Sequence, residues 1–129
     1  MPRTILIVED AEHYASALEM AILAIPDVEV AHAFTGRQAL EFLRSRAAPE
    51  VVALVTDLQM PVMDGFELIE QVRSAGRWAR LPIVVISGDT NPQTPERLKR
   101  LGADAYFTKP YSPGEVRNKV EELLNATGR

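Results

Sequence analysis

Side chains with chemistry to offer follow several apolar runs of this sequence. Glu9 and Asp10 come after the first run, Asp57 after the third, Ser87 after the fourth, and Lys109 shortly after the fifth. Apolar runs of this length are typical of buried β-strands. Because parallel strands end at the same edge of their sheet, the three carboxylates, the hydroxyl and the ammonium are expected to share one pocket. Such a set suits a divalent cation together with a phosphoryl group.

The charges of this set need compensation. Two unit charges about 4 Å apart repel by about 4 kcal/mol at an effective dielectric constant near 20. A hard divalent cation relieves that repulsion, and Mg²⁺ usually takes one or two carboxylates with water or phosphate oxygens. Lys109 would supply the remaining positive charge. Any one of these acids taken alone reads as a solvated loop residue, but their coincidence with Lys109 and Ser87 favours a magnesium site.

Strand-like and helix-like segments alternate along the chain. Strands are expected at Thr4–Val8, Val28–Ala33, Val51–Thr56, Ile83–Ile86 and Ala105–Phe107. Each is followed by apolar residues at helical spacing. Those expected to face inward are Tyr14, Leu18, Ile22, Ile25, Ala39, Leu40, Leu43, Phe66, Ile69, Val72, Leu98, Leu101, Val116, Val120, Leu123 and Leu124. Helix boundaries are indicated by Pro26-Asp27, Thr35, Pro49, Gly76, Pro95, Gly102 and Ser112-Pro113.

The pattern of these segments predicts the fold class. The first, third and fourth strands lack polar alternation, which is typical of strands buried on both faces of a parallel sheet. β-α units joined by right-handed crossovers predict an α/β fold with a doubly wound five-stranded parallel sheet. The expected strand order is 2-1-3-4-5, the flavodoxin-like order, in which ligands bind where the first and third strands end. At 129 residues the chain is expected to form a single domain, residues 1–129.

Composition narrows the classes of function. The net charge of -4 and a pI near 5.2 argue against direct binding of nucleic acid. The chain has no cysteine, which excludes disulfide and thiolate chemistry. No apolar run is long enough to cross a membrane, and the first residues lack the layout of a signal peptide, so a cytoplasmic location is expected.

Four motifs occur in an order that a known family shares. Glu9-Asp10 ends one strand, Asp57 ends another and is followed by Met60-Pro61-Val62-Met63-Asp64-Gly65, Ser87-Gly88 ends a third, and Lys109-Pro110 follows a fourth. With this order and spacing the chain resembles the receiver domain of two-component response regulators, as found in chemotaxis regulators. The resemblance covers about residues 4–125. The fold of that family is the doubly wound sheet expected above.

The resemblance implies a role for each motif residue. Asp57 would accept a phosphoryl group from a histidine kinase or a histidine phosphotransfer protein, and a carboxylate nucleophile is an established covalent strategy. Asp10 would bind Mg²⁺, with Glu9 acting through water and the Gln59 carbonyl as a further ligand. Lys109 would pair with a phosphoryl oxygen. The implied protein is a signalling switch rather than an enzyme, although it assists its own Mg²⁺-dependent phosphorylation and dephosphorylation.

The resemblance also implies how the switch operates. Ser87 would swing toward the phosphorylated site, Tyr106 would rotate inward after it, and the Lys109-Pro110 bond would be cis. The face built from the fourth helix, the fifth strand and the fifth helix would then exchange a downstream protein partner or a second copy of the chain. Alternatively, Tyr106 is a half-exposed aromatic residue of a strand and has no role in the switch. The basic run Arg97, Lys99 and Arg100 on the fourth helix could contact such a partner. Alternatively, it forms a solvated charged face.

Other positions carry smaller expectations. Gln59 and Asp89 each lie two residues beyond a key side chain, and both are expected to influence the lifetime of the acyl phosphate. Gly65 is expected to serve a turn with positive φ. His13 and His32 are expected at the surface.

Two other functions compete on the same fold. A flavin or nucleotide carrier would need phosphate-binding glycines after the first strand, where this chain has Glu9-Asp10. A phosphohydrolase with an aspartate nucleophile would usually carry a second aspartate where this chain has Gln59. The sequence is compatible both with a stand-alone regulator and with a receiver from a longer transcription factor or hybrid kinase.

Overall fold

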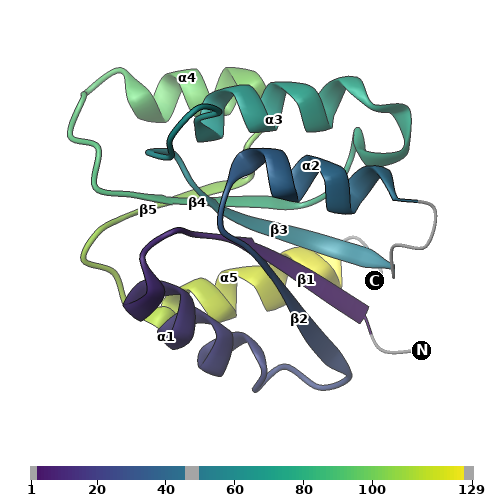
Figure 1. The fold of residues 1–129 in the computed structure, drawn as a ribbon. Coiled ribbons are helices and arrows are strands. Elements are labelled where there is room, and N and C mark those ends of the chain that lie inside the picture. The colour runs from purple at the N-terminus through teal and green to yellow at the C-terminus, as the bar shows by residue number, and fades with distance from the viewer. Residues whose placement is uncertain (1–2, 46–49, 127–129) are drawn as a thin grey trace.

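Strands and helices alternate along the chain (Figure 1). The computed structural model describes residues 3–45 and 50–126. The strands are β1 (Arg3–Val8), β2 (Val28–Ala33), β3 (Val51–Asp57), β4 (Ile83–Ser87) and β5 (Ala105–Thr108). The helices are α1 (Glu12–Ile22), α2 (Gly36–Arg44), α3 (Gly65–Ser74), α4 (Thr94–Leu101) and α5 (Pro113–Ala126), with a short 3₁₀ helix, η1, at Gly76–Trp78. Pro49, expected to end the second helix, lies outside the described residues.

The strands form one parallel sheet in the order β2-β1-β3-β4-β5, which confirms the predicted topology. Each strand begins and ends within one residue of its predicted bounds. Asp57 and Ser87 are the last residues of β3 and β4 rather than the first residues after them. Because the strands are parallel, their carboxyl ends lie along one edge of the sheet, where ligands bind in folds of this kind.

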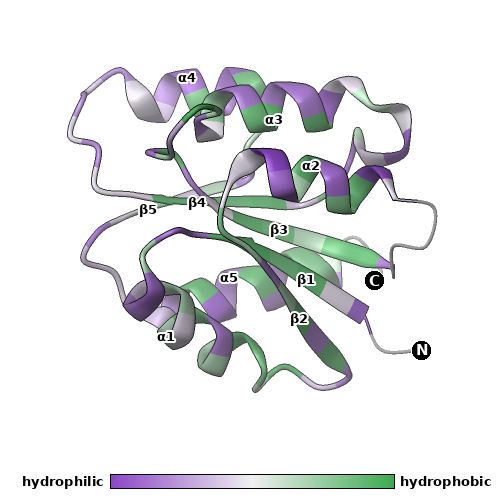
Figure 2. Ribbon diagram, viewed as in Figure 1, coloured by the Kyte–Doolittle hydropathy of each residue, from purple (hydrophilic) through white to green (hydrophobic). Residues whose placement is uncertain are grey.

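Helices cover both faces of the sheet (Figure 1). α1 and α5 pack on one face, and α2, α3 and α4 line the other. Alternate residues of β1 divide between the two cores: Ile5 and Ile7 pack on the α1–α5 side, and Leu6 and Val8 on the opposite side. Figure 2 shows β1, β3 and β4 hydrophobic along most of their length, whereas the helices alternate between hydrophobic and hydrophilic residues. The predicted burial of these strands on both faces is therefore confirmed.

Three helix boundaries have a local cause. Thr35 caps α2, and its hydroxyl accepts a hydrogen bond from the Gln38 N–H at 3.1 Å. Asp64 caps α3 in the same way, accepting from the Glu67 N–H at 2.9 Å. Gly102 follows α4 with a φ of 94°, in the left-handed region that favours glycine. None of the helices in the described ranges is long and apolar enough to cross a membrane.

The structure corrects several expected positions. Tyr14 is only half-buried, because it lies in the first turn of α1, close to the edge where the strands end. Ile25 is buried but lies beyond the end of α1. On α3, Phe66 is half-buried, and Leu68, which was not predicted, is fully buried. Gly76, expected to end the third helix, opens the η1 turn instead.

Candidate functional site

An ammonium group joins two buried carboxylates at the edge where the strands end. The Nζ of Lys109 lies 2.9 Å from Oδ2 of Asp57, and 3.2 and 3.1 Å from Oε1 and Oε2 of Glu9. Glu9 follows β1, Asp57 ends β3 and Lys109 follows β5, so distant parts of the chain supply the site. Glu9 is fully buried and Asp57 nearly so, while the Lys109 side chain is 14% exposed. The hydrogen bonds are charge-assisted and largely shielded from water, which strengthens them.

Backbone groups orient both carboxylates. Oδ1 of Asp57 accepts hydrogen bonds from the Leu58 N–H at 2.7 Å and the Gln59 N–H at 3.2 Å. Oε1 of Glu9 accepts from the Ala11 N–H at 3.0 Å. The loop after each strand therefore holds the carboxylate of that strand, and Oδ2 of Asp57 is left to face Lys109.

Three acids are close enough to hold one cation. Glu9, Asp10 and Asp57 each offer a carboxylate oxygen, and these oxygens lie within 4.8 Å of one another. Three carboxylates set against the single ammonium of Lys109 leave a formal charge of -2. Asp10 is exposed, so the cluster is open to solvent on one side. Hard oxygen donors with an excess of negative charge are the ligands that Mg²⁺ takes in proteins.

Burial and charge set the protonation of this site. Burial, reinforced by the negative charge of Asp57, raises the pKa of Glu9 to about 7, although hydrogen bonds from Ala11 and Lys109 work in the opposite direction. Burial acts to lower the pKa of Lys109, but its hydrogen bonds to Asp57 and Glu9 outweigh that effect and leave the pKa raised. Lys109 is therefore a cation at neutral pH, and it relieves only part of the repulsion between the two buried acids.

Close packing beneath Asp57 requires a glycine at position 65. A Cβ on Gly65 would lie 2.4 Å from the carbonyl oxygen of Asp57 and 2.7 Å from Cα of Leu58. The Gly65 N–H donates to the Leu58 carbonyl at 2.8 Å, which keeps the two segments together. The prediction of a positive φ at Gly65 is wrong: Val62 has the positive φ in this loop, at 68°. Gly65 is needed because α3 begins against the end of β3.

Ser87 and Tyr106 are connected through Asp89. Ser87 is fully buried, and its Oγ accepts a hydrogen bond from the Asp89 N–H at 3.0 Å. The Tyr106 hydroxyl donates to the Asp89 carbonyl at 3.1 Å. The Asp89 carboxylate accepts from the hydroxyl of Thr94, the first residue of α4, at 2.6 Å. Asp89, expected only to influence the lifetime of the acyl phosphate, thus links both predicted switch residues to α4.

Two aromatic side chains outside the predicted site residues lie next to the site: Tyr14 contacts Lys109, and Tyr111 stacks on Tyr14. The Lys109 Nζ lies 4.2 Å from the centre of the Tyr14 ring. The Tyr111 ring stacks on Tyr14 with the ring centres 5.6 Å apart. Tyr14 lies four residues after Asp10 and Tyr111 two after Lys109, so closeness to motif residues was the available signal. The Lys109–Pro110 bond is cis, as the resemblance implied.

Both histidines are exposed, as expected. The Nε2 of His32 lies 2.8 Å from the carbonyl oxygen of Glu9. The ring of His13 lies 4.4 Å from that of Tyr14. Both side chains therefore border the site.

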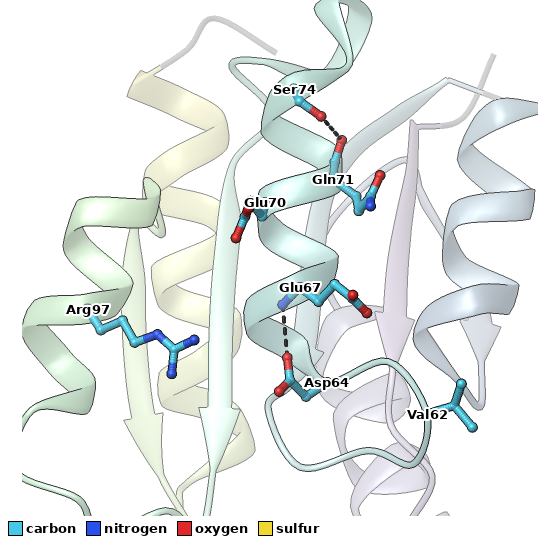
Figure 3. A pocket seen from close by; sticks show the side chains of 7 residues that line it. All are labelled: Val62, Asp64, Glu67, Glu70, Gln71, Ser74 and Arg97. Atoms are coloured by element: carbon cyan, nitrogen blue, oxygen red, sulfur yellow. Dashed lines mark hydrogen bonds between the residues drawn. The ribbon is translucent and has the colours of Figure 1, made fainter.

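A separate groove lies over α3 (Figure 3). It has a volume of about 460 Å³ and is lined by Val62, Asp64, Glu67, Glu70, Gln71, Ser74 and Arg97. In Figure 3 the Arg97 side chain points from α4 toward α3. Its guanidinium lies over the Phe66 ring of α3, 3.7 Å from the ring centre. Arg97 makes this aromatic contact but is exposed, as are Lys99 and Arg100, so the contact does not distinguish a solvated face from a partner-binding face. None of the lining residues is a predicted site residue, so the groove is distinct from the acid cluster.

Known proteins resemble this chain over most of its length. Residues 5–121 match the family model of the response regulator receiver domain. The chain is 30% identical over 123 residues to the two-component response regulator ORR11 of Oryza sativa, which covers 95% of this chain and 82% of that protein. It is 28% identical over 120 residues to the chemotaxis protein CheY1 of Helicobacter pylori, which covers 93% of this chain and 95% of that protein. The solved structure of the chemotaxis response regulator CheY4 of Vibrio cholerae has a TM-score of 0.81 at 26% identity, covering 96% of this chain and 100% of that one.

Proposed function

This chain belongs to the response regulator receiver domain family of two-component systems, and we propose that its phosphoryl acceptor is Asp57. The phosphoryl group comes from a histidine kinase or a histidine phosphotransfer protein, and residues 1–129 act as one receiver domain. Family membership sets aside the flavin carrier and the phosphohydrolase that the fold alone allowed. The protein acts as a signalling switch rather than as an enzyme with turnover.

The observation that carries the proposal is the contact of 2.9 Å between the Lys109 ammonium and Oδ2 of Asp57. A carboxylate that attacks a phosphoryl group needs a positive charge to receive the negative charge that develops on the phosphoryl oxygens. Lys109 lies at that position before a donor arrives. Backbone N–H groups hold the other oxygen of Asp57, so the acceptor is oriented in advance as well.

The acid cluster supports Mg²⁺ as the cofactor. Glu9, Asp10 and Asp57 bring hard oxygen donors together with an excess of negative charge, and this donor set fits the ion. Asp10 and Asp57 would bind it directly, Glu9 through water, and the Gln59 carbonyl would add a ligand. When bound, the ion would neutralise charge on the phosphoryl oxygens.

The chemical step moves a phosphoryl group from nitrogen to oxygen. A carboxylate oxygen of Asp57 attacks the phosphorus of a phosphohistidine, the P–N bond breaks, and its electron pair returns to the imidazole nitrogen, which takes up a proton. Lys109 donates to a phosphoryl oxygen as the negative charge develops. In dephosphorylation, water attacks the phosphorus and the bond to Asp57 breaks. Inorganic phosphate then leaves, and the Asp57 carboxylate is restored.

Ser87 and Tyr106 carry the change away from Asp57. On phosphorylation the Ser87 hydroxyl turns to donate to the phosphoryl group, which ends its contact with the Asp89 N–H. Tyr106 and the start of α4, both bonded to Asp89, then rearrange. A hollow of about 390 Å³, lined in part by Asp89, Tyr106 and Lys109, supports this path from the site to the surface. The face of α4, β5 and α5 then exchanges a protein partner or a second copy of the chain.

Intact-mass spectrometry after incubation with Mg²⁺ and acetyl phosphate tests the proposal. The wild type is expected to gain one phosphoryl group, and Asp57→Asn is expected to gain none. Asp64→Asn is the matched control: it makes the same change in the loop that follows Asp57, and asparagine still caps α3. Asp64→Asn is expected to be labelled like the wild type. EDTA is expected to abolish the labelling of the wild type and of Asp64→Asn. Equal labelling of Asp57→Asn would exclude Asp57 as the acceptor.

A further inference from the structure

Two tyrosines from distant segments form a wall beside Lys109. The Tyr14 ring presents its face to the Lys109 ammonium, with Nζ 4.2 Å from the ring centre. The Tyr111 ring stacks on Tyr14 at 5.6 Å, with an angle of 29° between the ring planes. We call Tyr14 and Tyr111 the aromatic wall. It connects the first turn of α1 to the loop before α5, and neither residue belongs to the motifs that identify the family.

The wall limits the freedom of the Lys109 side chain. A lysine ammonium is a compact charge on a flexible four-carbon stem, so other groups must hold it in place. The Lys109 ammonium donates hydrogen bonds to Asp57 and Glu9, and the face of the Tyr14 ring contacts the same ammonium. The face of an aromatic ring carries negative charge and attracts a cation within about 6 Å of the ring centre. Tyr14 therefore restrains the ammonium without competing for its hydrogen bonds.

The ring of Tyr111, rather than its hydroxyl, accounts for its contacts. The Tyr111 ring is half-buried and packs against the core on the α1–α5 side. Its hydroxyl oxygen is buried and has no hydrogen-bond partner within residues 3–45 and 50–126. Burial, and to a smaller extent the charge of Glu9, raises the pKa of Tyr111, so the hydroxyl stays protonated. A buried hydroxyl without a partner contributes no stabilising bond, so the contribution of this side chain comes from its ring, which packs on the core and stacks on Tyr14.

We propose that Tyr14 is a positioning residue for phosphoryl transfer: its ring holds the Lys109 ammonium at Asp57, and the Tyr111 ring, stacked on Tyr14, holds Tyr14 in place. This inference rests on the proposed function, because it requires Asp57 to be the acceptor and Lys109 to assist it. Tyr14 acts on phosphoryl transfer through Lys109 rather than by contact with Asp57. The position of the ammonium, and with it the rate of phosphoryl transfer, then depends on the aromatic wall.

Paired substitutions separate the ring from the hydroxyl. Tyr14→Leu removes the aromatic face but keeps an apolar side chain, whereas Tyr14→Phe keeps the face and removes only the hydroxyl. Tyr111→Leu and Tyr111→Phe form the same pair for the supporting ring. Phe34→Leu is the matched control, since Phe34 is an exposed aromatic residue outside the wall. Urea unfolding of each variant shows whether it is folded under the assay conditions.

Two measurements are made on the full chain. The first is the initial rate of labelling by acetyl phosphate with Mg²⁺, followed by intact mass over a range of donor concentrations. The second is the NMR signal of the Lys109 Cε–Hε group, which the Tyr14 ring current shifts only while the two groups are in contact. Tyr14→Leu is expected to slow labelling about three- to thirtyfold and to lose the shift. Tyr14→Phe and Tyr111→Phe are expected to retain the shift and a rate within about twofold of the wild type, and Tyr111→Leu a smaller loss than Tyr14→Leu.

The outcomes distinguish the inference from the proposed function. A wild type that gains no phosphoryl group refutes the proposed function and the inference with it. Labelling of Tyr14→Leu at the rate of the wild type overturns the inference alone. Slow labelling of the two phenylalanine variants assigns the effect to the hydroxyls and also overturns it. A Phe34→Leu variant as slow as Tyr14→Leu shows a general effect of losing an aromatic residue, which is a third refutation.

Discussion

Replacing Gly65 with alanine tests whether the contact between α3 and β3 fixes the phosphoryl acceptor. The new Cβ would lie 2.4 Å from the carbonyl oxygen of Asp57 and 2.7 Å from Cα of Leu58. Cβ atoms essentially never come closer than 3.0 Å to a non-bonded heavy atom, so the start of α3 and the end of β3 must separate by about 0.6 Å. Asp57 and Leu58 are buried, and the two closest contacts are with backbone atoms, so a side-chain rotation cannot relieve them.

The expected magnitude combines two effects of opposite sign. Overpacking a close-packed site costs about 1–3 kcal/mol. Alanine gains up to about 1 kcal/mol over glycine inside a helix, and less at the first helical residue, which is where Gly65 lies. We therefore expect the free energy of unfolding to fall by about 1–3 kcal/mol. The rate of labelling is expected to fall by up to about 100-fold, because a misplacement near 1 Å can cost that much.

Urea unfolding followed by the fluorescence of Trp78, the only tryptophan, measures the change in stability. Gly76→Ala is the matched control, since a Cβ on Gly76 would meet nothing within 4 Å. It is expected to change the free energy of unfolding by no more than about 0.5 kcal/mol. Equal stability and equal labelling rates for the two alanine variants would refute the reasoning, because the predicted clash would then have no consequence.

Three further predictions follow from single contacts. Thr35→Ala removes the cap bond to Gln38 and should lower the free energy of unfolding by about 1 kcal/mol, whereas Thr35→Ser should retain it; equal urea midpoints for both would contradict this. Tyr111→Phe removes a buried hydroxyl that has no partner in the described ranges, so it should raise the thermal midpoint, and a lower midpoint would count against it. The pKa of Asp89 lies below its ordinary value, chiefly because the Thr94 hydroxyl donates to the carboxylate. A lowered carboxylate pKa stabilises the folded state above the ordinary value near 3.9, and this contribution disappears as the pH falls through the lowered value. Asp89→Ala should therefore destabilise the protein near pH 7 and much less near pH 2, as measured by urea unfolding at each pH; an effect independent of pH would be a refutation.

Much of the fold was predictable because its signals are local. The apolar runs that became β1, β3 and β4 contain no polar alternation, so their burial on both faces could be predicted before any contact was known. The cap at Thr35 and the glycine at position 102 are also local features, and both predictions are confirmed. Helical spacing places Tyr14 on the inner face of its helix, but it does not indicate what that face meets at the first turn, and Tyr14 is only half-buried.

Gly65 shows the limit of local signals most directly. A glycine in a loop rich in Pro and Gly predicts a turn, and the turn does contain a positive φ, but at Val62. The demand on Gly65 comes from the approach of the end of β3 to within 2.4 Å of its missing Cβ. That approach depends on how α3 packs on the sheet, which no pattern within the loop encodes.

Which side chains gather at one edge of the sheet follows from the order of residues along the chain. Strand ends, the handedness of crossovers and the order of the motifs are enough to bring Glu9, Asp57 and Lys109 together. Packing between distant segments decides which oxygen of Asp57 faces Lys109, that Glu9 is fully buried, and that the Tyr14 ring contacts the ammonium and stacks on Tyr111. Topology places residues in a neighbourhood, whereas contacts at hydrogen-bond distance depend on the packing of segments far apart in the chain.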